Sequence, residues 1–212
     1  METPKNPLSI NYRIREGLAR MAMIARLDEW NRAKASGVNP TQLAILTLLE
    51  GRGSGMGVKD VAAHLGVSQP TATDSILALE KKGLVVKRAD AADKRAVSVA
   101  LTEDGLAALA HEGGDLGEQA VGSLEDREQE ELLLALVKMI RHLQEQNAIP
   151  VQRMCVTCRF FGPFAHPDED RPHHCHLVNA AFGQRDLRVD CREHEQADPA
   201  IRAATWAAFQ TG

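Results

Sequence analysis

The chain has 212 residues, 44% of them hydrophobic, so it is long enough to bury a core and to form one domain plus a smaller second one. No apolar run approaches the roughly 18 residues that a membrane helix needs, and the N-terminal residues lack the apolar core of a secretory signal, so a soluble cytoplasmic protein is expected. The net charge of −4 argues against a protein that coats nucleic acid without sequence preference.

Charge is distributed unevenly along the chain. Between Arg52 and Arg95 there are eight Lys and Arg residues against five Asp and Glu, and between Lys5 and Lys34 there are seven against three. Between Glu103 and Glu131, ten acids accompany one Arg. Because attraction to DNA depends on the local field, this asymmetry is compatible with a basic face that contacts DNA, although ordinary solvated surface charge explains it equally well.

Two helices are expected ahead of residue 52. An apolar stripe at steps of three and four indicates an amphipathic helix over residues 9–35. Its members are Ile10, Ile14, Leu18, Met21 and Ala25. Asn39 is a good N-cap, and Pro40 suits the first position of a second helix. Gln42 completes a capping box, so this helix is predicted to run as far as Gly51.

A helix-turn-helix is predicted from Val58 onward. Gly66 makes the turn and Ser68 caps the second helix, with Pro70 near its start. Three apolar residues at helical spacing are expected to face inward: Ala72, Ile76 and Leu79. The polar residues left on the outer, N-terminal part are Gln69, Thr71, Thr73, Asp74 and Ser75. Short polar side chains there suit a helix in the major groove of DNA, although exposed helix starts of this composition are common.

Two strands joined by a charged loop are predicted next, over Leu84–Val86 and Val97–Leu101. The cations at the two ends of the loop are Lys87, Arg88, Lys94 and Arg95. Long cationic side chains on a protruding loop can enter a minor groove, and Asp93 can orient a neighbouring Arg by a charge-assisted hydrogen bond. A charged hairpin tip that makes no DNA contact is the alternative.

Taken together, these segments resemble the MarR family of winged-helix transcriptional regulators. The segments SQPTATDSILALEKKGLVVKR, DKR and LTEDG follow in the order and spacing of that family. The resemblance covers residues 9–147 and implies a homodimer, joined by its first and last helices, that binds a palindromic operator in double-stranded DNA. By position, the residues that it places in the recognition helix and the wing are Ser68, Thr71, Thr73, Asp93 and Arg95.

One position departs from the family's pattern. Asp74 stands where many relatives carry Arg, and an acid facing phosphate weakens binding unless it accepts a hydrogen bond from cytosine or a neighbouring Arg. Asp74 is therefore left out of the expected DNA contacts. These are Ser68, Gln69, Thr71, Thr73, Ser75, Arg88, Lys94 and Arg95.

Two further helices are expected before the resemblance ends. Thr102 can cap the first, which has two acids in its first turn, and Gly113-Gly114 weakens or bends it. The second runs from Glu125 to Asn147. Its apolar stripe consists of Leu132, Leu133, Leu136, Val137, Ile140 and Leu143. Pairing of this stripe with the N-terminal helix, as in the family, favours a two-fold dimer with half-sites about one DNA turn apart.

The composition changes near Pro150. All four cysteines, all five phenylalanines and five of the eight histidines lie after residue 154. Residues 1–150 are therefore expected to form the DNA-binding and dimerisation domain, and residues 151–212 a cysteine-rich module. In a cytoplasmic protein, clustered cysteines indicate metal or redox chemistry before structural disulfides. The candidate ligands are Cys155, Cys158, Cys175 and Cys191.

The spacing of these cysteines leaves the nature of the centre open. Four thiolates suit either an iron–sulfur cluster, [4Fe–4S] or [2Fe–2S], or a closed zinc site. A cluster is favoured because it uses all four, and the spacing resembles that of high-potential iron–sulfur proteins. An apolar shell for it is available from Phe160, Phe161, Phe164 and Phe182. Zinc is the alternative: it would use the Cys191–His194 pair and leave Cys175 unexplained. A metal-free thiol switch is the third interpretation of the four cysteines.

The expected fold is mainly α (α+β): a winged helix-turn-helix with long dimerisation helices and a small C-terminal metal- or cluster-binding module. The leading hypothesis is a homodimeric repressor that senses redox state through the four cysteines. The alternative is the same regulator with a structural zinc tail, controlled by a small phenolic ligand bound between the dimer helices and the winged domain. An enzyme is not expected, because the chain has neither a thioredoxin-like βαβ pattern nor a nucleotide-binding glycine fingerprint.

Overall fold

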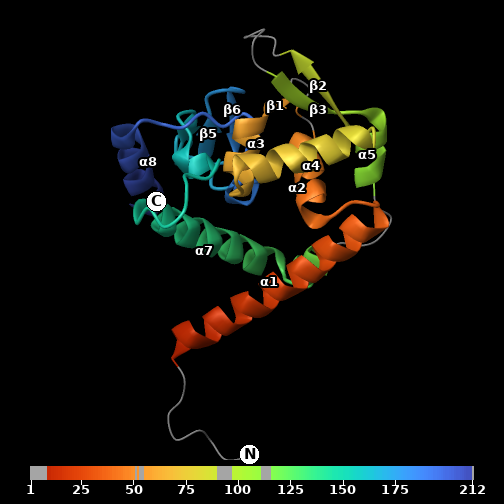
Figure 1. The fold of residues 1–212 in the computed structure, drawn as a ribbon. Coiled ribbons are helices and arrows are strands. Elements are labelled where there is room, and N and C mark those ends of the chain that lie inside the picture. The colour runs from red at the N-terminus through yellow and green to blue at the C-terminus, as the bar shows by residue number, and fades with distance from the viewer. Residues whose placement is uncertain (1–8, 51, 53–54, 90–96, 111–115, 212) are drawn as a thin grey trace, which may run out of the picture. The chain divides into compact units, whose positions relative to one another are not determined.

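A computed structural model describes residues 9–50, 52, 55–89, 97–110 and 116–211 (Figure 1). The chain divides into two compact units, Met1–Gly122 and Ser123–Gly212, and each is described by itself. Each combines helices with one small sheet, and the chain as described is mainly helical, which confirms that part of the expected fold class. Within the described ranges, no helix is both long enough and apolar enough to cross a membrane.

The first two helices of unit 1 each begin at a side-chain cap, of which only the second was predicted. Helix α1 (Ile10–Ala35) follows Ser9, whose hydroxyl accepts a hydrogen bond from the Tyr12 N–H at 3.3 Å. Helix α2 (Pro40–Leu49) has the predicted capping box. Asn39 Oδ1 accepts from the Gln42 N–H at 2.8 Å, and Gln42 Oε1 accepts from the Asn39 N–H at 3.3 Å. These reciprocal bonds satisfy backbone donors that the first turn leaves open.

The helix-turn-helix and its sheet follow. Helix α3 (Val58–Leu65) ends at Gly66, whose φ of +65° is a left-handed conformation that favours glycine, and α4 (Gln69–Lys81) begins after the Ser68 cap. The predicted strands are β2 (Val85–Ala89) and β3 (Val97–Leu101). A third strand, β1 (Met56–Gly57), was not anticipated, and it pairs with β3 to give an antiparallel sheet of order β1-β3-β2.

The core of unit 1 forms between α2, α3, α4 and the sheet. Its most deeply buried side chains are Ile45, Leu46, Leu49, Val61, Ile76, Leu79 and Val99. Ala72, Ile76 and Leu79 are fully buried, so the predicted inward face of α4 is confirmed. This packing fixes which face of α4 remains outside.

Two short helices complete unit 1, α5 (Glu103–Leu109) and α6 (Leu116–Gly122). Thr102 caps α5 as predicted: its hydroxyl oxygen accepts from the Gly105 N–H at 3.0 Å and its hydroxyl donates to Gly83 O at 2.7 Å. The bend expected at Gly113-Gly114 lies outside the described residues.

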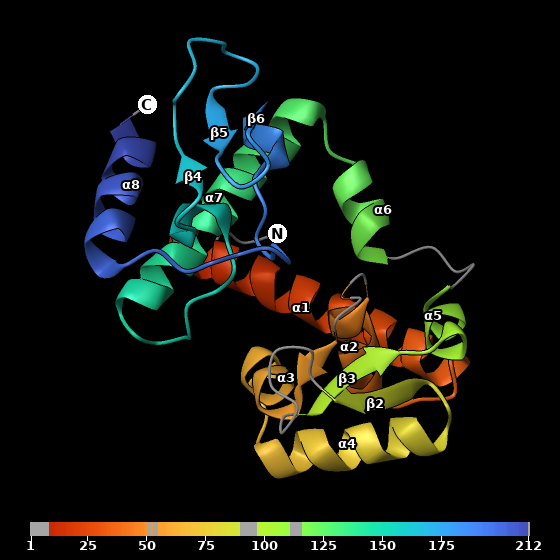
Figure 2. The ribbon, with the colours of Figure 1, turned by 90° about the horizontal axis from the view of Figure 1, so that it is seen from above.

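Unit 2 consists of a long helix followed by a small antiparallel sheet and a terminal helix. Its elements are α7 (Asp126–Glu145), η1 (Cys155–Thr157), β4 (Phe161–Gly162), β5 (His173–Cys175), β6 (Ala180–Phe182), η2 (Gln184–Asp186) and α8 (Pro199–Thr211). The three strands lie side by side in the order β4-β5-β6 (Figure 2). No strand was predicted here, because each is only two or three residues long and carries too little alternation to recognise.

The core of unit 2 joins α7 to the cysteine-rich segment. Its buried members are Val137, Met154, Val156, Phe161, Leu187, Trp206 and Phe209. Trp206 and Phe209 of α8 stack with their ring centroids 5.7 Å apart. Because α7 packs into this core, the compact units divide at Gly122/Ser123, earlier than the change of composition near Pro150.

Candidate functional sites

The outer face of α4 carries the predicted major-groove residues. Ser68, Gln69 and Thr71 are exposed, and Thr73 and Ser75 are half-buried. The Ser68 hydroxyl accepts from the Thr71 N–H at 3.2 Å and lies 2.8 Å from the Thr71 hydroxyl. The Thr73 hydroxyl donates to Gln69 O at 2.8 Å. Local hydrogen bonds therefore orient these short side chains before any partner binds.

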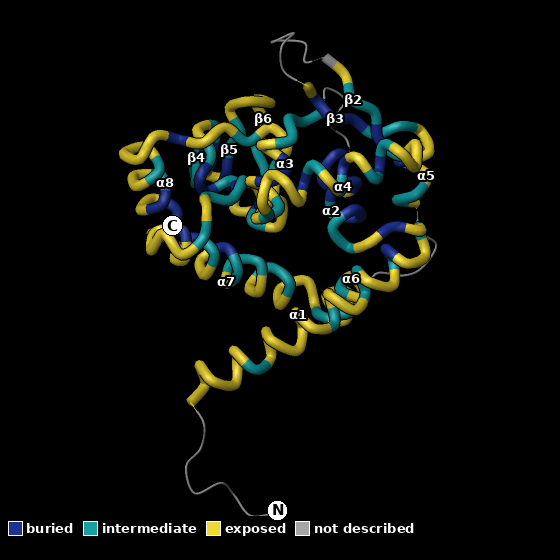
Figure 3. Tube along the Cα trace, viewed as in Figure 1, coloured by how far each residue is buried: buried dark blue, intermediate teal, exposed yellow. Residues whose placement is uncertain are grey.

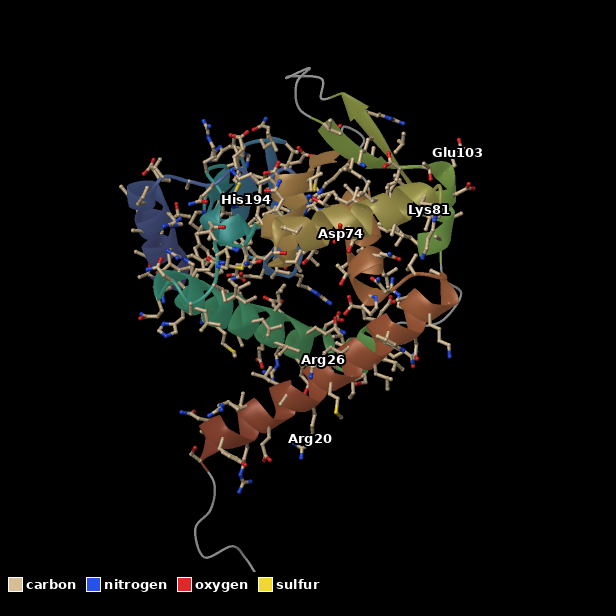
Figure 4. All side chains as sticks on the ribbon, in the orientation of Figure 1. Arg20, Arg26, Asp74, Lys81, Glu103 and His194 are labelled. Carbon is tan, nitrogen blue, oxygen red and sulfur yellow. The ribbon has the colours of Figure 1, made fainter. Side chains whose placement is uncertain are left out.

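Asp74 lies on the same exposed face of α4, with Lys81 farther along the helix (Figure 4). Side-chain contacts hold the C-terminal end of α4 in place. Lys82 Nζ donates to Gly37 O at 2.7 Å and to Gln42 Oε1 at 3.1 Å, and Lys87 Nζ lies 2.7 Å from Glu80 Oε2. These contacts tie α4 to α2 and β2, so the helix is held by rigid elements.

The predicted wing is described only in part. Arg88 is exposed on β2, opposite Ser98 of β3. Lys94 and Arg95, together with Asp90 and Asp93, lie outside the described residues. The position of Arg88 near the end of the strand is consistent with a cation at the base of a wing.

A cavity of about 340 Å³ lies behind the sheet of unit 1. Its lining residues are Leu49, Arg52, Arg88, Ala100, Leu101, Thr102, Glu103 and Leu106. Two guanidinium groups, one carboxylate (Glu103) and four apolar side chains line it, so its charge balance favours an organic anion that has an apolar body.

The apolar stripe of α1 is exposed to solvent, as the yellow course of the helix shows (Figure 3). Ile10 is 67% exposed, Ile14 49% and Met21 43%. Contiguous exposed apolar side chains of this size mark an interaction surface. Leu132 and Leu143 of α7 are also exposed, whereas Val137 faces the core of its own unit.

The four cysteines line one cavity of about 40 Å³, although 36 residues separate the first from the last. The other lining residues are Phe160, Phe161, Leu177, Phe182 and Glu193. Three of the four phenylalanines expected to surround the site thus line it, while Phe164 packs in the core of the unit. The structure therefore assembles the predicted ligand set in a mostly apolar pocket.

Each cysteine is placed by backbone pairing. Cys155 and Cys158 bracket η1, where the Cys158 N–H donates to Cys155 O at 2.9 Å. Cys175 ends β5 opposite Phe161 of β4. The Cys191 N–H donates to Arg153 O at 2.8 Å. The small sheet therefore brings Cys175 to the tight pair, and the hydrogen bond to Arg153 brings Cys191 there.

Arg188 donates to two of the thiols. Its backbone N–H lies 3.3 Å from Cys155 Sγ, and its Nη1 lies 3.7 Å from Cys191 Sγ. Hydrogen bonds to thiolate sulfur are among the means by which proteins set the potential of iron–sulfur centres. Sequence reasoning missed Arg188; a cation three residues before Cys191 was the one available signal.

Burial dominates the electrostatics of the site. It raises the pKa of the Cys155 thiol to about 11, with the neighbouring Cys191 and Cys158 acting in the same direction and the Arg188 N–H opposing them. Burial also lowers the pKa of His194, whose Nε2 lies 2.9 Å from Thr157 Oγ1. His194 does not line the thiol cavity, so the described geometry gives no support to it as a fourth ligand.

The thiols border two cavities. In the part of the chain that the structure describes, no three His, Cys, Asp or Glu side chains are grouped tightly enough to hold a single metal ion. A second cavity, of about 280 Å³, borders Cys155, Cys175 and Cys191 but not Cys158, so the site is more accessible on one side.

Comparison with known proteins agrees with the geometry of unit 1. Residues 38–97, from just before α2 to the first residue of β3, match the model of the MarR family. None of the curated proteins compared with the chain matches it.

Several solved structures resemble the chain. A MarR transcriptional regulator from Methanosarcina mazei Go1 is 21% identical, with a TM-score of 0.51, over 63% of this chain and 98% of its own. The S. aureus MepR–DNA complex is 24% identical (TM-score 0.49; 65% and 100% covered). CouR from Rhodococcus jostii RHA1 bound to p-coumaroyl-CoA is 23% identical (TM-score 0.47; 68% and 98% covered). The likeness to the Methanosarcina protein shows a shared fold.

Proposed function

We propose that this chain is a DNA-binding transcriptional regulator of the MarR type. The observation that carries the proposal is the geometry of α4, which is anchored by its buried face and presents short, pre-oriented polar side chains at its N-terminal end. The match of residues 38–97 to the MarR family model supports it. The proposed DNA contacts are Ser68, Gln69, Thr71, Thr73, Ser75, Arg88, Lys94 and Arg95.

Replacement of Arg88 by Ala tests the proposed wing. We expect Arg88→Ala to weaken binding evenly across sequences and to reduce the salt slope of the binding constant by about 1, because one phosphate contact is lost. The measurement is fluorescence anisotropy at several salt concentrations, on a duplex selected from random DNA. Arg127→Ala, on α7, is the matched control, since it removes the same charge from a side chain that is 85% exposed. Equal salt slopes for Arg88→Ala and the parent would contradict a DNA contact by the wing. Failure to select any DNA sequence would contradict the proposed function as a sequence-specific regulator.

The regulator is proposed to act as a homodimer in which α1 contributes its exposed apolar stripe. Leu18→Glu places a charge in that stripe, so we expect the sedimenting mass to fall to that of one chain. Arg26→Glu, which lies on α1 outside the stripe (Figure 4), is expected to leave the mass unchanged. A single-chain mass for the parent protein, or a Leu18→Glu variant that stays dimeric, would refute this interface.

Control is proposed to come from an iron–sulfur cluster bound by the four cysteines. Two observations support a cluster: the cavity that all four thiols share, and the N–H donors of Arg188. The cavity beside Cys155, Cys175 and Cys191 gives small oxidants access, so loss or oxidation of the cluster is proposed to change operator affinity. A structural zinc ion is the alternative occupant.

A second candidate control is a small organic anion, and the cavity beside Arg52 and Arg88 favours it. This control would act within the winged unit, together with a structural zinc tail. Release of the operator by a phenolic carboxylate, with an unchanged response to oxidants, would support it over the cluster.

A further inference from the structure

Six residues, Gly183–Arg188, connect the four-cysteine site to the first turn of α7. The segment consists of Gly183, the η2 turn, Leu187 and Arg188, and is called the relay segment below. All of its contacts described here lie within unit 2.

One anchor of the relay segment is an ion pair with α7. Arg185 Nη1 lies 2.8 Å from Asp126 Oδ2, and Arg185 Nη2 donates to Asp126 Oδ1 at 3.0 Å. This two-pronged contact also lowers the pKa of the Asp126 carboxyl. Asp126 is the first residue of α7 and lies four positions beyond Gly122, where unit 1 ends.

The other anchor is the site itself. The Arg188 N–H donates to Cys155 Sγ, the Cys155 N–H donates back to Arg188 O at 3.0 Å, and the Arg188 guanidinium reaches Cys191 Sγ. Arg188 therefore contacts one cysteine of the tight pair and the most distant cysteine in the sequence.

The middle of the segment is held in place by packing. Leu187 is 5% exposed and belongs to the same core as Val137 of α7. Gly183 is buried, and a Cβ there would lie 2.6 Å from Asp170 O. The Phe164 N–H donates to His173 Nδ1, so His173 Nε2 carries the proton that bonds Gln184 Oε1 at 3.1 Å. Burial and hydrogen bonds therefore hold the middle of the segment, while the Arg185 and Asp126 side chains meet at an exposed surface.

We propose that the relay segment transmits occupancy of the four-cysteine site to the first turn of α7, with Arg188 and Arg185 as positioning residues. The proposal rests on the proposed function, because it takes the cysteines to hold a centre that controls DNA binding. A ligating cysteine is a thiolate, and a hydrogen bond to a charged acceptor is about twice as strong as one to a neutral acceptor. A thiol that has lost its centre is only a weak acceptor. Release of the centre therefore weakens the Arg188–sulfur hydrogen bonds. The η2 turn then becomes more mobile, and the Arg185–Asp126 ion pair is weakened in turn.

Hydrogen–deuterium exchange on the full chain tests the relay, with the protein as isolated anaerobically and after removal of the metal by a chelator. We expect removal to speed exchange about fivefold in peptides covering residues 183–190 and in the first turn of α7. Operator affinity of both forms is measured on the same samples.

The Arg185→Gln variant distinguishes transmission through the relay segment from a general loss of stability when the metal is removed. It cuts the α7 anchor and leaves every thiol contact in place, so iron, sulfide and the absorbance spectrum should match the parent. Exchange at the first turn of α7 should then be equally fast in the loaded and stripped forms, and the ratio of their operator affinities should fall toward one. Arg159→Gln is the control, because it breaks the exposed Arg159–Glu195 pair beside Cys158 but lies outside the segment.

The outcomes distinguish two failures. A loaded parent protein whose α7 exchange does not change on stripping overturns the relay and leaves the proposed function standing. An Arg185→Gln variant whose α7 exchange and operator affinity still change on stripping as much as in the parent also overturns the relay. A parent protein isolated without any metal overturns the proposed cofactor and the relay with it.

Discussion

The Cys175→Ser variant is expected to lose the bound centre and to change operator affinity. Cys175 lines the thiol cavity from the end of β5, and a cluster needs all four thiolates. Because loss of even an outer partner weakens metal affinity about 10–100-fold, loss of a ligand should cost at least as much. Operator affinity should then differ from the parent by about 5–150-fold, the range of allosteric coupling. The measurements are iron, zinc and sulfide analysis, an ultraviolet–visible spectrum and anisotropy on the operator, all under anaerobic conditions.

His194→Gln is the matched control for Cys175→Ser. A zinc site of three cysteines and one histidine would need His194 and could spare Cys175. In the structure, His194 bonds Thr157 and does not line the cavity, whereas Cys175 does. We expect His194→Gln to keep the centre. Loss of metal in His194→Gln but not in Cys175→Ser, or a parent protein that contains zinc without iron and sulfide, would contradict the cluster.

The Gly105→Ala variant is expected to destabilise unit 1 although Ala is the better helix former. A Cβ at Gly105 would overlap Leu84 O and lie 3.0 Å from Leu84 C, so backbone rather than a flexible side chain would have to shift. Overpacking of this kind costs about 1–3 kcal/mol or more, which exceeds the gain of at most about 1 kcal/mol in helix propensity. Urea unfolding followed by circular dichroism should show a lower midpoint with an unchanged slope.

Gly17→Ala is the control for this prediction. Gly17 lies within α1 and nothing approaches its missing Cβ within 4 Å, so the same substitution should be neutral or stabilise by up to about 1 kcal/mol. A midpoint for Gly105→Ala at or above that of the parent would show that the close approach to Leu84 is absent in solution.

Much of unit 1 could be predicted from the sequence because its signals are local. Asn39, Ser68 and Thr102 each cap the helix expected of them, and Gly66 makes the turn. A cap depends on residues within one turn, so its pattern is visible in the chain itself. The inward face of α4 was predictable for the same reason, since helical spacing fixes which residues share a face.

The four-cysteine site was predictable only as a list of residues. The spacing identified Cys155, Cys158, Cys175 and Cys191 but left several centres open. That all four line one cavity depends on the pairing of β4 with β5 and on the backbone contact of Cys191 with Arg153, and neither has a recognisable sequence pattern. Arg188 could not be assigned, because its role arises from where its N–H groups point after folding.

The sequence by itself determined most of the helices, the turn and the set of candidate ligands, because these follow from caps, periodicity and side-chain chemistry within a few residues. Only the tertiary structure decided the partners of α7, the pairing of β1 with β3, and the meeting of Cys155 with Cys191. Each of these joins residues far apart in the chain, and the burial that stabilises them is non-directional, so no local pattern specifies which distant groups meet.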